Sequence, residues 1–400
     1  MDKFESILAE AVKQGSNIVP GAVVAVVDKD GNYVYKHVDG FNGVGKNAQP
    51  LEFDATYFIA SCTKLITSIA ALQAVERGLI TLDEPLDKIM PEFAALPIAS
   101  LNGDEVVLTP ATNSVTLRHL VTHSSGAVYD IMSPALAAWR ASKGEEVGFR
   151  TTGIGEEDYA YPRAFEAGES WSYGPGLDWA GLVVARLNKT TFEDYVEENV
   201  AKPLGIKSFT WHPFSKKPEV GQKLMKGSSR NDEGVLTDGP TPFWPEPVAE
   251  GGTGGAGLYT NVHDYTRVLT DLLKAEPVLL KKETADGLFT PQFAEGSNAL
   301  AGLLANGEFS YQVTFNNSLE SVVLNHGLGG VVLIEDVVRE DYFKPKGTLT
   351  WSGMPNLLWS VNRERGLALF FATQVAPWGD RKAQALGAAF ETEVWRNLSK

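Results

Sequence analysis

The sequence predicts an α+β protein in which strands from both ends of the chain form one antiparallel sheet. Runs rich in valine, isoleucine and aromatic residues occur near the amino terminus and again toward the carboxyl terminus. Segments with the period of amphipathic helices fill much of the middle. A mostly helical segment is therefore expected between the two groups of strands.

The expected elements begin with a helix over about residues 2 to 15 and a hairpin over residues 21–35, where two β-rich runs flank a Gly/Asp turn. An apolar helix follows Ser61. Turns and helices continue to about residue 210, with helical periodicity at 117–121 and 177–187. The remaining expected elements are a helix at 264–269, strands at 331–334, 347–351, 357–361 and 367–371, and a final helix from near Arg381.

The chain is expected to divide into two lobes. Residues 1–60 and 255–400 would form the sheet domain, and residues 61–254 a mostly helical domain. Residues 211–257 are rich in proline and glycine and predict a long loop region. Because long ordered loops in compact proteins usually carry function, this region should shape a substrate pocket.

Ser61 and Lys64 have the spacing of a serine nucleophile with its own base. Residues three apart share one helical face, so the hydroxyl and the amine can meet. A serine hydroxyl needs an adjacent base, and a lysine serves as one only when it is neutral, which burial favours. The apolar run after Lys64 indicates such burial. Cys62 is a rival nucleophile, but its side chain should point about 100° away from the lysine face, which favours packing.

Composition excludes several classes of function. The formal charge of -15 argues against a nucleic-acid or anionic-membrane partner, because both need concentrated lysine and arginine. No apolar stretch reaches the roughly 18 residues of a membrane span, and the first residues lack a secretory signal, so a cytoplasmic protein is expected. The single cysteine excludes an internal disulfide framework and a multi-cysteine zinc site.

Three other functional motifs are not supported by the sequence around them. His119 and His123 have the spacing of a zinc pair, but Leu120 stands where a metalloprotease helix has glutamate, so no metal is expected. Residues 252–257 match Gly-x-Gly-x-x-Gly, yet a proline-rich segment precedes them where a strand is required. No Gly-x-Ser-x-Gly surrounds a candidate nucleophile, which removes the α/β-hydrolase interpretation. No cofactor is expected.

A Ser-x-x-Lys spacing alone is weak, because composition produces about one in a chain of this length. Several further blocks in order resemble the serine β-lactamase-related superfamily, and within it the class C-like (family VIII) esterases and the fungal acyltransferase (transesterase) of statin side-chain biosynthesis. The resemblance implies a β-lactamase/penicillin-binding-protein-like fold, an antiparallel sheet flanked by helices. It is carried by residues 61–64, 76–85, 117–126, 168–181, 202–206, 327–330 and 347–356.

The resemblance implies roles for residues beyond Ser61 and Lys64. Tyr173 matches the family tyrosine that shares proton transfer with the lysine. The backbone N–H groups of Ser61 and Met354 would form the oxyanion hole. Substrate contacts are expected from Trp351, Ser352, Gly353, Tyr129, Trp244 and His326, the last with a strand end as the alternative.

Two departures from the β-lactamase pattern predict poor β-lactam hydrolysis. Trp351-Ser352-Gly353 replaces the Lys-Thr-Gly triplet, which removes a cation suited to a β-lactam carboxylate. Pro175 stands where β-lactamases have an asparagine two residues after the tyrosine.

The expected reaction proceeds through an acyl-Ser61 intermediate. The donor would be an ester or thioester, and the acceptor an alcohol of a hydrophobic small molecule or water. An acyl-carrier domain of a polyketide synthase is left open as a partner that delivers the donor. The alternatives are a carboxylesterase without transferase role and, in another class, an acylated binding or sensor protein without turnover. The acyl group and the acceptor depend on pocket shape.

Overall fold

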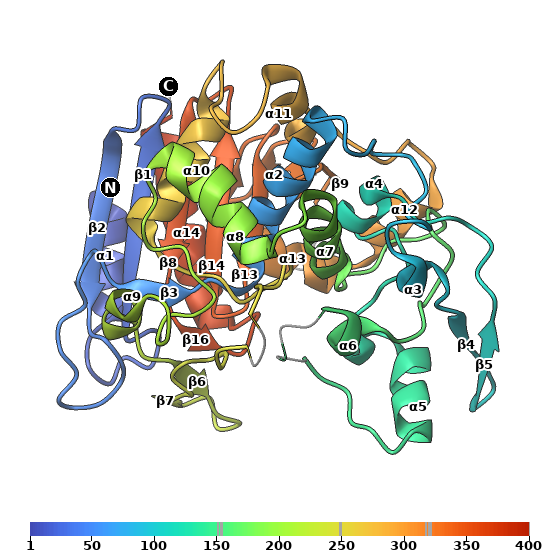
Figure 1. Cartoon of the computed structure of the whole chain (residues 1–400). Coiled ribbons are helices and arrows are strands. Elements are labelled where there is room, and N and C mark those ends of the chain that lie inside the picture. Colours follow the sequence, from blue (N-terminus) through green and yellow to red (C-terminus); the bar gives the residue numbers. More distant parts are fainter. Residues whose placement is uncertain (150–151, 153–154, 248–249, 317, 319–321, 400) are drawn as a thin grey trace.

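The computed structural model describes residues 1–149, 152, 155–247, 250–316, 318 and 322–399 (Figure 1). Its helices are α1 (Asp2–Ala11), α2 (Thr63–Glu76), α3 (Pro91–Ala94), α4 (Leu117–Val121), α5 (Pro134–Ser142), α6 (Gly155–Tyr159), α7 (Gly176–Asn188), α8 (Phe192–Val196), α9 (Pro218–Gln222), α10 (Val262–Leu273), α11 (Lys282–Phe289), α12 (Asn298–Ala305), α13 (Gly307–Thr314) and α14 (Arg381–Asn397). Short 3₁₀ or π turns are η1 (Ala60–Cys62), η2 (Asp130–Met132), η3 (Glu197–Ala201) and η4 (Lys202–Leu204).

The main sheet has seven antiparallel strands in the order β2-β1-β15-β14-β13-β10-β9. Its strands are β1 (Gly21–Asp28), β2 (Tyr33–Gly40), β9 (Leu324–His326), β10 (Val331–Leu333), β13 (Leu349–Gly353), β14 (Leu357–Asn362) and β15 (Leu367–Ala372). Smaller sheets are formed by β3 (Thr56–Phe58) with β8 (Tyr259–Asn261), β4 (Ile98–Asn102) with β5 (Glu105–Thr109), β6 (Ser228–Arg230) with β7 (Leu236–Asp238) and β16 (Val375–Ala376), and β11 (Val337–Val338) with β12 (Phe343–Lys344).

Both faces of this sheet are buried, which explains why its central strands are almost uninterrupted apolar runs. Successive residues of β15 point to opposite faces, so Phe371 packs with α1 and α14 while Phe370 packs against Tyr265 of α10. In Figure 1, α10 lies on one face of the sheet and α1 with α14 on the other. Burial on two faces fixes the register, because a one-residue slip would exchange every side chain between the two cores.

Helix α2 lies between the sheet and the helices inserted after it. Its residues from Thr63 to Ala74 are all buried, and it packs against α7 (Figure 1). A helix that is buried all round is expected to be apolar on most of its faces, and the run after Lys64 is mostly apolar. The start of α2, which carries Lys64 and directly follows the turn with Ser61, is thereby placed at the junction of the two groups of elements.

The predicted α+β architecture and its antiparallel sheet are present, but some local expectations differ. Helix α1 ends at Ala11 rather than near residue 15, because the chain turns before Gly15, which has a φ of 85°. The hairpin of β4 and β5 occupies a segment for which turns and helices were expected. The expected loop region 211–257 contains α9, β6 and β7 within the part that the structure describes.

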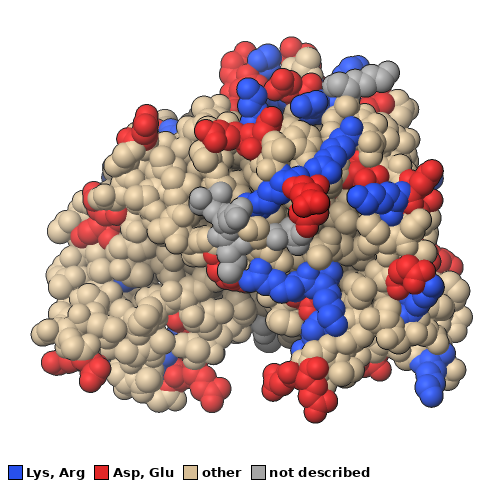
Figure 2. Space-filling view, turned by 180° about the vertical axis from the view of Figure 1, so that it is seen from behind, with Lys and Arg blue, Asp and Glu red and all other residues tan. Residues whose placement is uncertain are grey.

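The surface carries charges of both signs. Figure 2 shows Lys and Arg side chains lying among Asp and Glu side chains on the back face. Arg118 and Asp83 form an ion pair with two nitrogen–oxygen distances of 2.7 Å. Within the described residues, no helix is both long and apolar enough to span a membrane.

A buried ion pair supports the strands that lead to the site. Lys344 Nζ lies 3.1 Å from the carboxylate of Glu391 on α14, and neither side chain is exposed. The carboxylate also accepts from Ser360 Oγ of β14, while Lys344 donates to Thr350 Oγ1 of β13. The network therefore ties α14 to two adjacent strands of the sheet.

We expect Glu391→Gln to lower the free energy of unfolding by about 3–5 kcal/mol, because it leaves the Lys344 ammonium buried without its counter-charge. Urea denaturation at pH 7 measures the loss. Glu393→Gln on the same helix is the control and should change stability by no more than about 0.5 kcal/mol. Equal stabilities of the two variants would contradict a structural role for the ion pair.

Candidate active site

Ser61 lies in a sharp turn between strand β3 and helix α2. The turn is the 3₁₀ segment Ala60–Cys62, so Ser61 precedes the first residue of α2. Ala60 has a φ of 46°, a left-handed conformation that is uncommon for a residue with a Cβ. Thr63 Oγ1 donates to Ala60 O at 2.6 Å and holds the turn. Strain of this kind persists where the surrounding structure fixes the chain, often at functional sites.

Lys64 lies in the first turn of α2 and is 3% exposed. Its Nζ donates to Gly255 O at 2.7 Å, to Ser61 Oγ at 3.3 Å and to Tyr129 OH at 3.3 Å. An ammonium group has three protons, so these three acceptors use its full hydrogen-bonding capacity. The lysine is buried as the sequence predicted, and its amine is directed at the serine.

Tyr173 contacts Ser61 from a segment of the chain distant from Lys64. Its OH lies 2.6 Å from Ser61 Oγ, and its ring centroid is 4.8 Å from Lys64 Nζ. The segment that carries it is held against the preceding loop, since Tyr129 N donates to Tyr173 O at 3.3 Å. Gly174 permits this approach, because an added Cβ would lie 2.0 Å from Ala127 O. The structure thus brings the serine, the lysine and the tyrosine into one hydrogen-bonded group.

Cys62 does not share this environment. Its side chain is completely buried in the core, and burial raises the pKa of its thiol. A thiol that stays protonated is a poor nucleophile. The expectation that Cys62 packs rather than reacts agrees with this position.

A cavity of about 330 Å³ opens over Ser61 Oγ and is lined mostly by aromatic and aliphatic side chains. Five residues that the sequence assigned to the site line it: Ser61, Tyr129, Tyr173, Trp244 and Met354. The sequence did not single out the other nine, which come from segments far apart in the chain. The full lining is Phe58, Ala60, Ser61, Tyr129, Ile131, Met132, Phe149, Tyr159, Tyr173, Trp244, Ala256, Met354, Pro377 and Trp378.

Four residues for which substrate contacts were expected do not line this cavity. Trp351 and His326 are buried behind Tyr173, and the Trp351 ring centroid lies 5.7 Å from that of Tyr173. Ser352 Oγ accepts from Trp378 Nε1 at 3.3 Å and so supports a cavity wall from behind. Gly353 packs against the turn that carries Ser61. These positions give the four residues a supporting place rather than a lining one.

Gly353 allows strand β13 to approach the nucleophile turn. A Cβ added to Gly353 would lie 2.4 Å from Ile59 O, closer than any side chain allows. The next residue, Met354, therefore reaches the cavity that contains Ser61. The two backbone N–H groups expected to form an oxyanion hole consequently come from adjacent segments.

The histidines behind Tyr173 are uncharged. The His123 ring centroid lies 4.9 Å from that of Tyr173 and 5.7 Å from that of His326. Burial, with smaller contributions from His326 and Lys64, holds the pKa of His123 well below its ordinary value. Burial also lowers the pKa of His326 to about 4, against the effect of its bond to Gly327 O. At neutral pH neither imidazole adds a positive charge beside Lys64.

His119 has a local structural role. It forms a capping box with Thr116 at the start of α4, in which its Nδ1 accepts from Thr116 N at 3.3 Å. Over the part of the chain that the structure describes, no three His, Cys, Asp or Glu side chains gather as a metal site would require.

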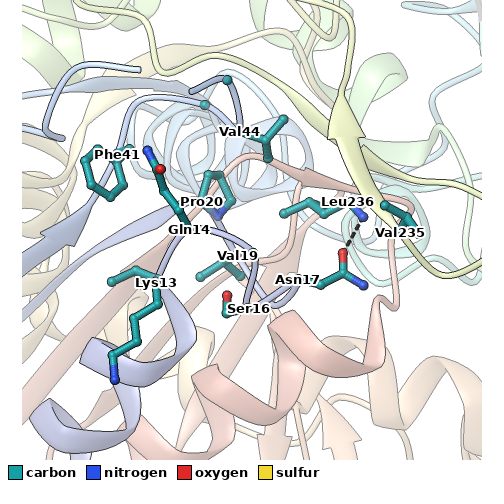
Figure 3. Close-up of a pocket in the computed structure, with 14 residues that line it drawn as sticks. Lys13, Gln14, Ser16, Asn17, Val19, Pro20, Phe41, Val44, Val235 and Leu236 are labelled. Carbon is teal, nitrogen blue, oxygen red and sulfur yellow. Dashed lines mark hydrogen bonds between the residues drawn. The ribbon is translucent and has the colours of Figure 1, made fainter. Parts of the chain in front are cut away.

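A larger cavity, about 410 Å³, lies between the α1–β1 loop, residues 41–45 and the tip of the β6–β7 hairpin (Figure 3). Two of its lining residues with potentially reactive side chains, Lys13 and Ser16, already have hydrogen-bond or ion-pair partners. Lys13 pairs with Glu10, and Ser16 Oγ donates to Ala11 O. This cavity shares no lining residue with the one over Ser61, so it contains none of the residues that the sequence assigned to the site.

A sequence profile for the family described as Beta-lactamase matches residues 4–393. The chain belongs to the β-lactamase family. This membership confirms the resemblance and the β-lactamase-like α+β fold predicted from the sequence, and it makes the protein an enzyme of the serine hydrolase and acyltransferase type.

Relatives within this family are similar over almost their whole length. The acyltransferase calJ of Penicillium decumbens is 36% identical, over 99% of this chain and 98% of its own. The lovastatin esterase of Penicillium rubens is 33% identical over 95% of both chains. Among solved structures, unliganded simvastatin synthase from Aspergillus terreus, as its selenomethionyl derivative, superposes with a TM-score of 0.87 at 30% identity, over 100% of this chain and 98% of that one.

We expect Gly353→Ala to reduce kcat/KM for ester cleavage by about 100-fold, because the new methyl group must push β13 or the Ser61 turn aside by roughly an ångström. Steady-state kinetics with p-nitrophenyl butyrate, together with the thermal unfolding midpoint, measure the effect. Gly45→Ala is the control, since its Cβ would meet nothing within 4 Å. Parent-like activity of Gly353→Ala would show that the close approach is not needed.

Proposed function

We propose that this enzyme transfers an acyl group from an ester or thioester to a hydroxyl of a hydrophobic small molecule, through an acyl-Ser61 intermediate. The observation that carries the proposal is the hydrogen-bonded group of Ser61, Lys64 and Tyr173 at an aromatic cavity. A nucleophile with a base in hydrogen-bond reach is the arrangement that covalent acyl transfer requires.

In the first step Ser61 Oγ attacks the donor carbonyl and its proton passes to the Tyr173–Lys64 pair, which acts as the base in the form that has already lost one proton to solvent. The 2.6 Å separation of the two hydroxyl oxygens is short enough for direct proton transfer. The negative charge that develops on the carbonyl oxygen would be held by the N–H groups of Ser61 and Met354. As the intermediate collapses, the carbon–leaving-group bond breaks and the same proton goes to the departing alcohol or thiol.

In the second step the acceptor hydroxyl replaces the leaving group. It gives its proton to the Tyr173–Lys64 pair, forms a bond to the acyl carbon and releases Ser61 with the proton returned to Oγ. Tyr129 OH, 3.3 Å from Lys64 Nζ, keeps the ammonium directed at this group. Burial raises the pKa of Tyr129 well above its ordinary value, so it would act as a neutral phenol.

Transfer is favoured over hydrolysis by the composition of the cavity. An apolar wall binds a hydrophobic alcohol near the acyl carbon and excludes ordered water, and effective molarity can then offset the high concentration of water. Relatives support acceptors and donors of this kind: the protein 32% identical from Aspergillus terreus is a monacolin J acid methylbutanoyltransferase. An acyl-carrier domain as the bearer of a thioester donor is part of the proposal.

Hydrolysis is the second candidate, since one relative is a lovastatin esterase and the same three residues serve both reactions. An acylated sensor without turnover is disfavoured by Tyr173, which gives acyl-Ser61 a base for deacylation. A cytoplasmic location is also proposed, in keeping with a single cysteine that is buried and free.

Lys64→Ala and Tyr173→Phe should each lower the acylation rate by about 100-fold or more, the usual scale for general acid–base groups. Their effects should not add, because both residues move one proton. Burst kinetics with a p-nitrophenyl ester measure acylation directly. Ser61→Ala, which should abolish it without loss of fold, is the reference for background hydrolysis. A double variant whose loss is the product of the two single losses would mean that the residues act independently.

A bulky hydrophobic alcohol added to an ester-cleavage assay should divert acyl flux to a new ester. Trp244→Ala should shift the partition toward free acid by about tenfold, because opening the wall admits water, and a tenfold change needs only ~1.4 kcal/mol of relative barrier. Chromatography of both products gives the ratio. Trp139→Ala, away from the cavity lining, is the matched control. Free acid as the sole product across a wide alcohol panel would replace the transferase proposal by the esterase one.

A further inference from the structure

Asp178 is a buried carboxylate that no step of the proposed reaction uses. It lies in the first turn of α7, five residues after Tyr173, and is 4% exposed. Its Oδ1 accepts from Gly255 N at 3.0 Å, and Oδ2 is buried with no hydrogen-bond partner among the described residues. A buried carboxylate is costly, so its presence next to the site requires a reason.

Gly255 lies between Asp178 and Lys64. Its N–H donates to the carboxylate, while its C=O accepts from Lys64 Nζ at 2.7 Å, the shortest of the hydrogen bonds that Lys64 makes. The fit is tight, because a Cβ at this position would lie 2.1 Å from Asp178 Oδ2. One glycine thus connects a buried anion to the buried cation of the site.

The loop around Gly255 is held on both sides. Thr67 Oγ1, one turn beyond Lys64 on α2, donates to Gly254 O at 2.6 Å. Trp211 Nε1 lies 3.0 Å from Ala256 O. Asp178 is thus the side chain that fixes Gly255 itself, between two neighbours that other side chains hold.

We infer that Asp178 is a positioning residue for acyl transfer, which holds Gly255 in place to orient the Lys64 amine and supplies the negative charge that balances the Lys64 ammonium. The inference rests on the proposed function. The segment from Tyr173 to Asp178 then supplies both the tyrosine that contacts Ser61 and the carboxylate that balances the charge of Lys64. A displacement of this segment would therefore affect both groups.

The electrostatic environment agrees with this role. Burial raises the pKa of Asp178 to about 6 against the opposing effects of the Lys64 charge and the Gly255 N–H, so most of the carboxylate is ionised at neutral pH. Asp158 is the second nearby carboxylate and acts in the raising direction. The other titratable groups that face Lys64 are the neutral side chains of Cys62, His123 and Tyr129, together with Tyr173.

Asp178→Asn keeps the shape and an acceptor for Gly255 N–H but removes the charge. An anion favours the protonated, cationic form of the Lys64–Tyr173 pair, so its removal should let the pair lose its proton more readily. The midpoint of the acid limb of the pH–rate profile should therefore move to lower pH, by roughly 0.5 to 1 unit. Acylation at pH 8 should fall about tenfold, because the Gly255 carbonyl is held less firmly.

The experiment is a kcat/KM profile for p-nitrophenyl butyrate from pH 5 to 9 on the parent, on Asp178→Asn and on Asp264→Asn. Asp264 is the control, a buried carboxylate that also accepts backbone N–H groups, at Lys207 and Ser208 away from the site. The thermal unfolding midpoint at pH 7.5, measured on all three proteins, shows whether a loss of rate reflects a loss of fold.

A parent-like pH midpoint in Asp178→Asn overturns the inference, whether or not its rate or stability falls. Should Asp178→Asn not accumulate as folded protein, Asp178→Ser is a second charge-free variant to which the same criterion applies. Ser61→Ala distinguishes failure of the proposed function from failure of this inference. Activity in Ser61→Ala would overturn the proposed function itself. An inactive Ser61→Ala together with a parent-like pH midpoint in Asp178→Asn would overturn this inference alone.

Discussion

The contacts of one buried ammonium group, Lys64 Nζ, connect the parts of the candidate site. Its three acceptors come from the nucleophile turn, the loop before η2 and the glycine-rich loop before β8. A charge in such a position is tolerated only if its hydrogen bonds are satisfied and an opposite charge is near. The placement of Ser61, of the Gly255 loop and of Asp178 on α7 can each be understood as a response to that requirement.

The scaffold holds these segments through close backbone approaches rather than through large side chains. Strand β13 reaches the Ser61 turn because Gly353 leaves room for Ile59 O, and Gly174 lets the Tyr173 segment reach Ala127 O. The sheet behind them is buried on both faces and tied to α14 by the Lys344–Glu391 pair. A rigid support of this kind keeps the reacting atoms within the small tolerance that acid–base chemistry requires.

The fold and the local pattern of the site could be predicted from the sequence, because both depend on patterns among residues that are close together in the chain. Alternating and periodic apolar runs predicted the strands and α2, and the three-residue spacing of Ser61 and Lys64 predicted their encounter. The roles of these residues and the division into two lobes stay predictions. What the sequence could not supply depends on contacts between distant segments. Asp178 and Gly255 carry no local signal for each other, and Trp351 and His326 were expected at the pocket although packing places them behind Tyr173.

The order of strands has a consequence for how the chain acquires its structure. Strands β1 and β15 are neighbours in the sheet, with Val23 paired to Ala372, so residues from opposite ends of the chain must meet. Such pairing has a high contact order and forms slowly. The chain entropy lost in closing a very long loop must be spent before the contacts that compensate for it can form. During synthesis β1 leaves the ribosome long before β15 has been made. Until then the apolar side chains of β1 lack their final packing partners. The nascent chain therefore depends on α1, β2 and α10 to shield β1, and the molecule completes its sheet only after the last strands emerge.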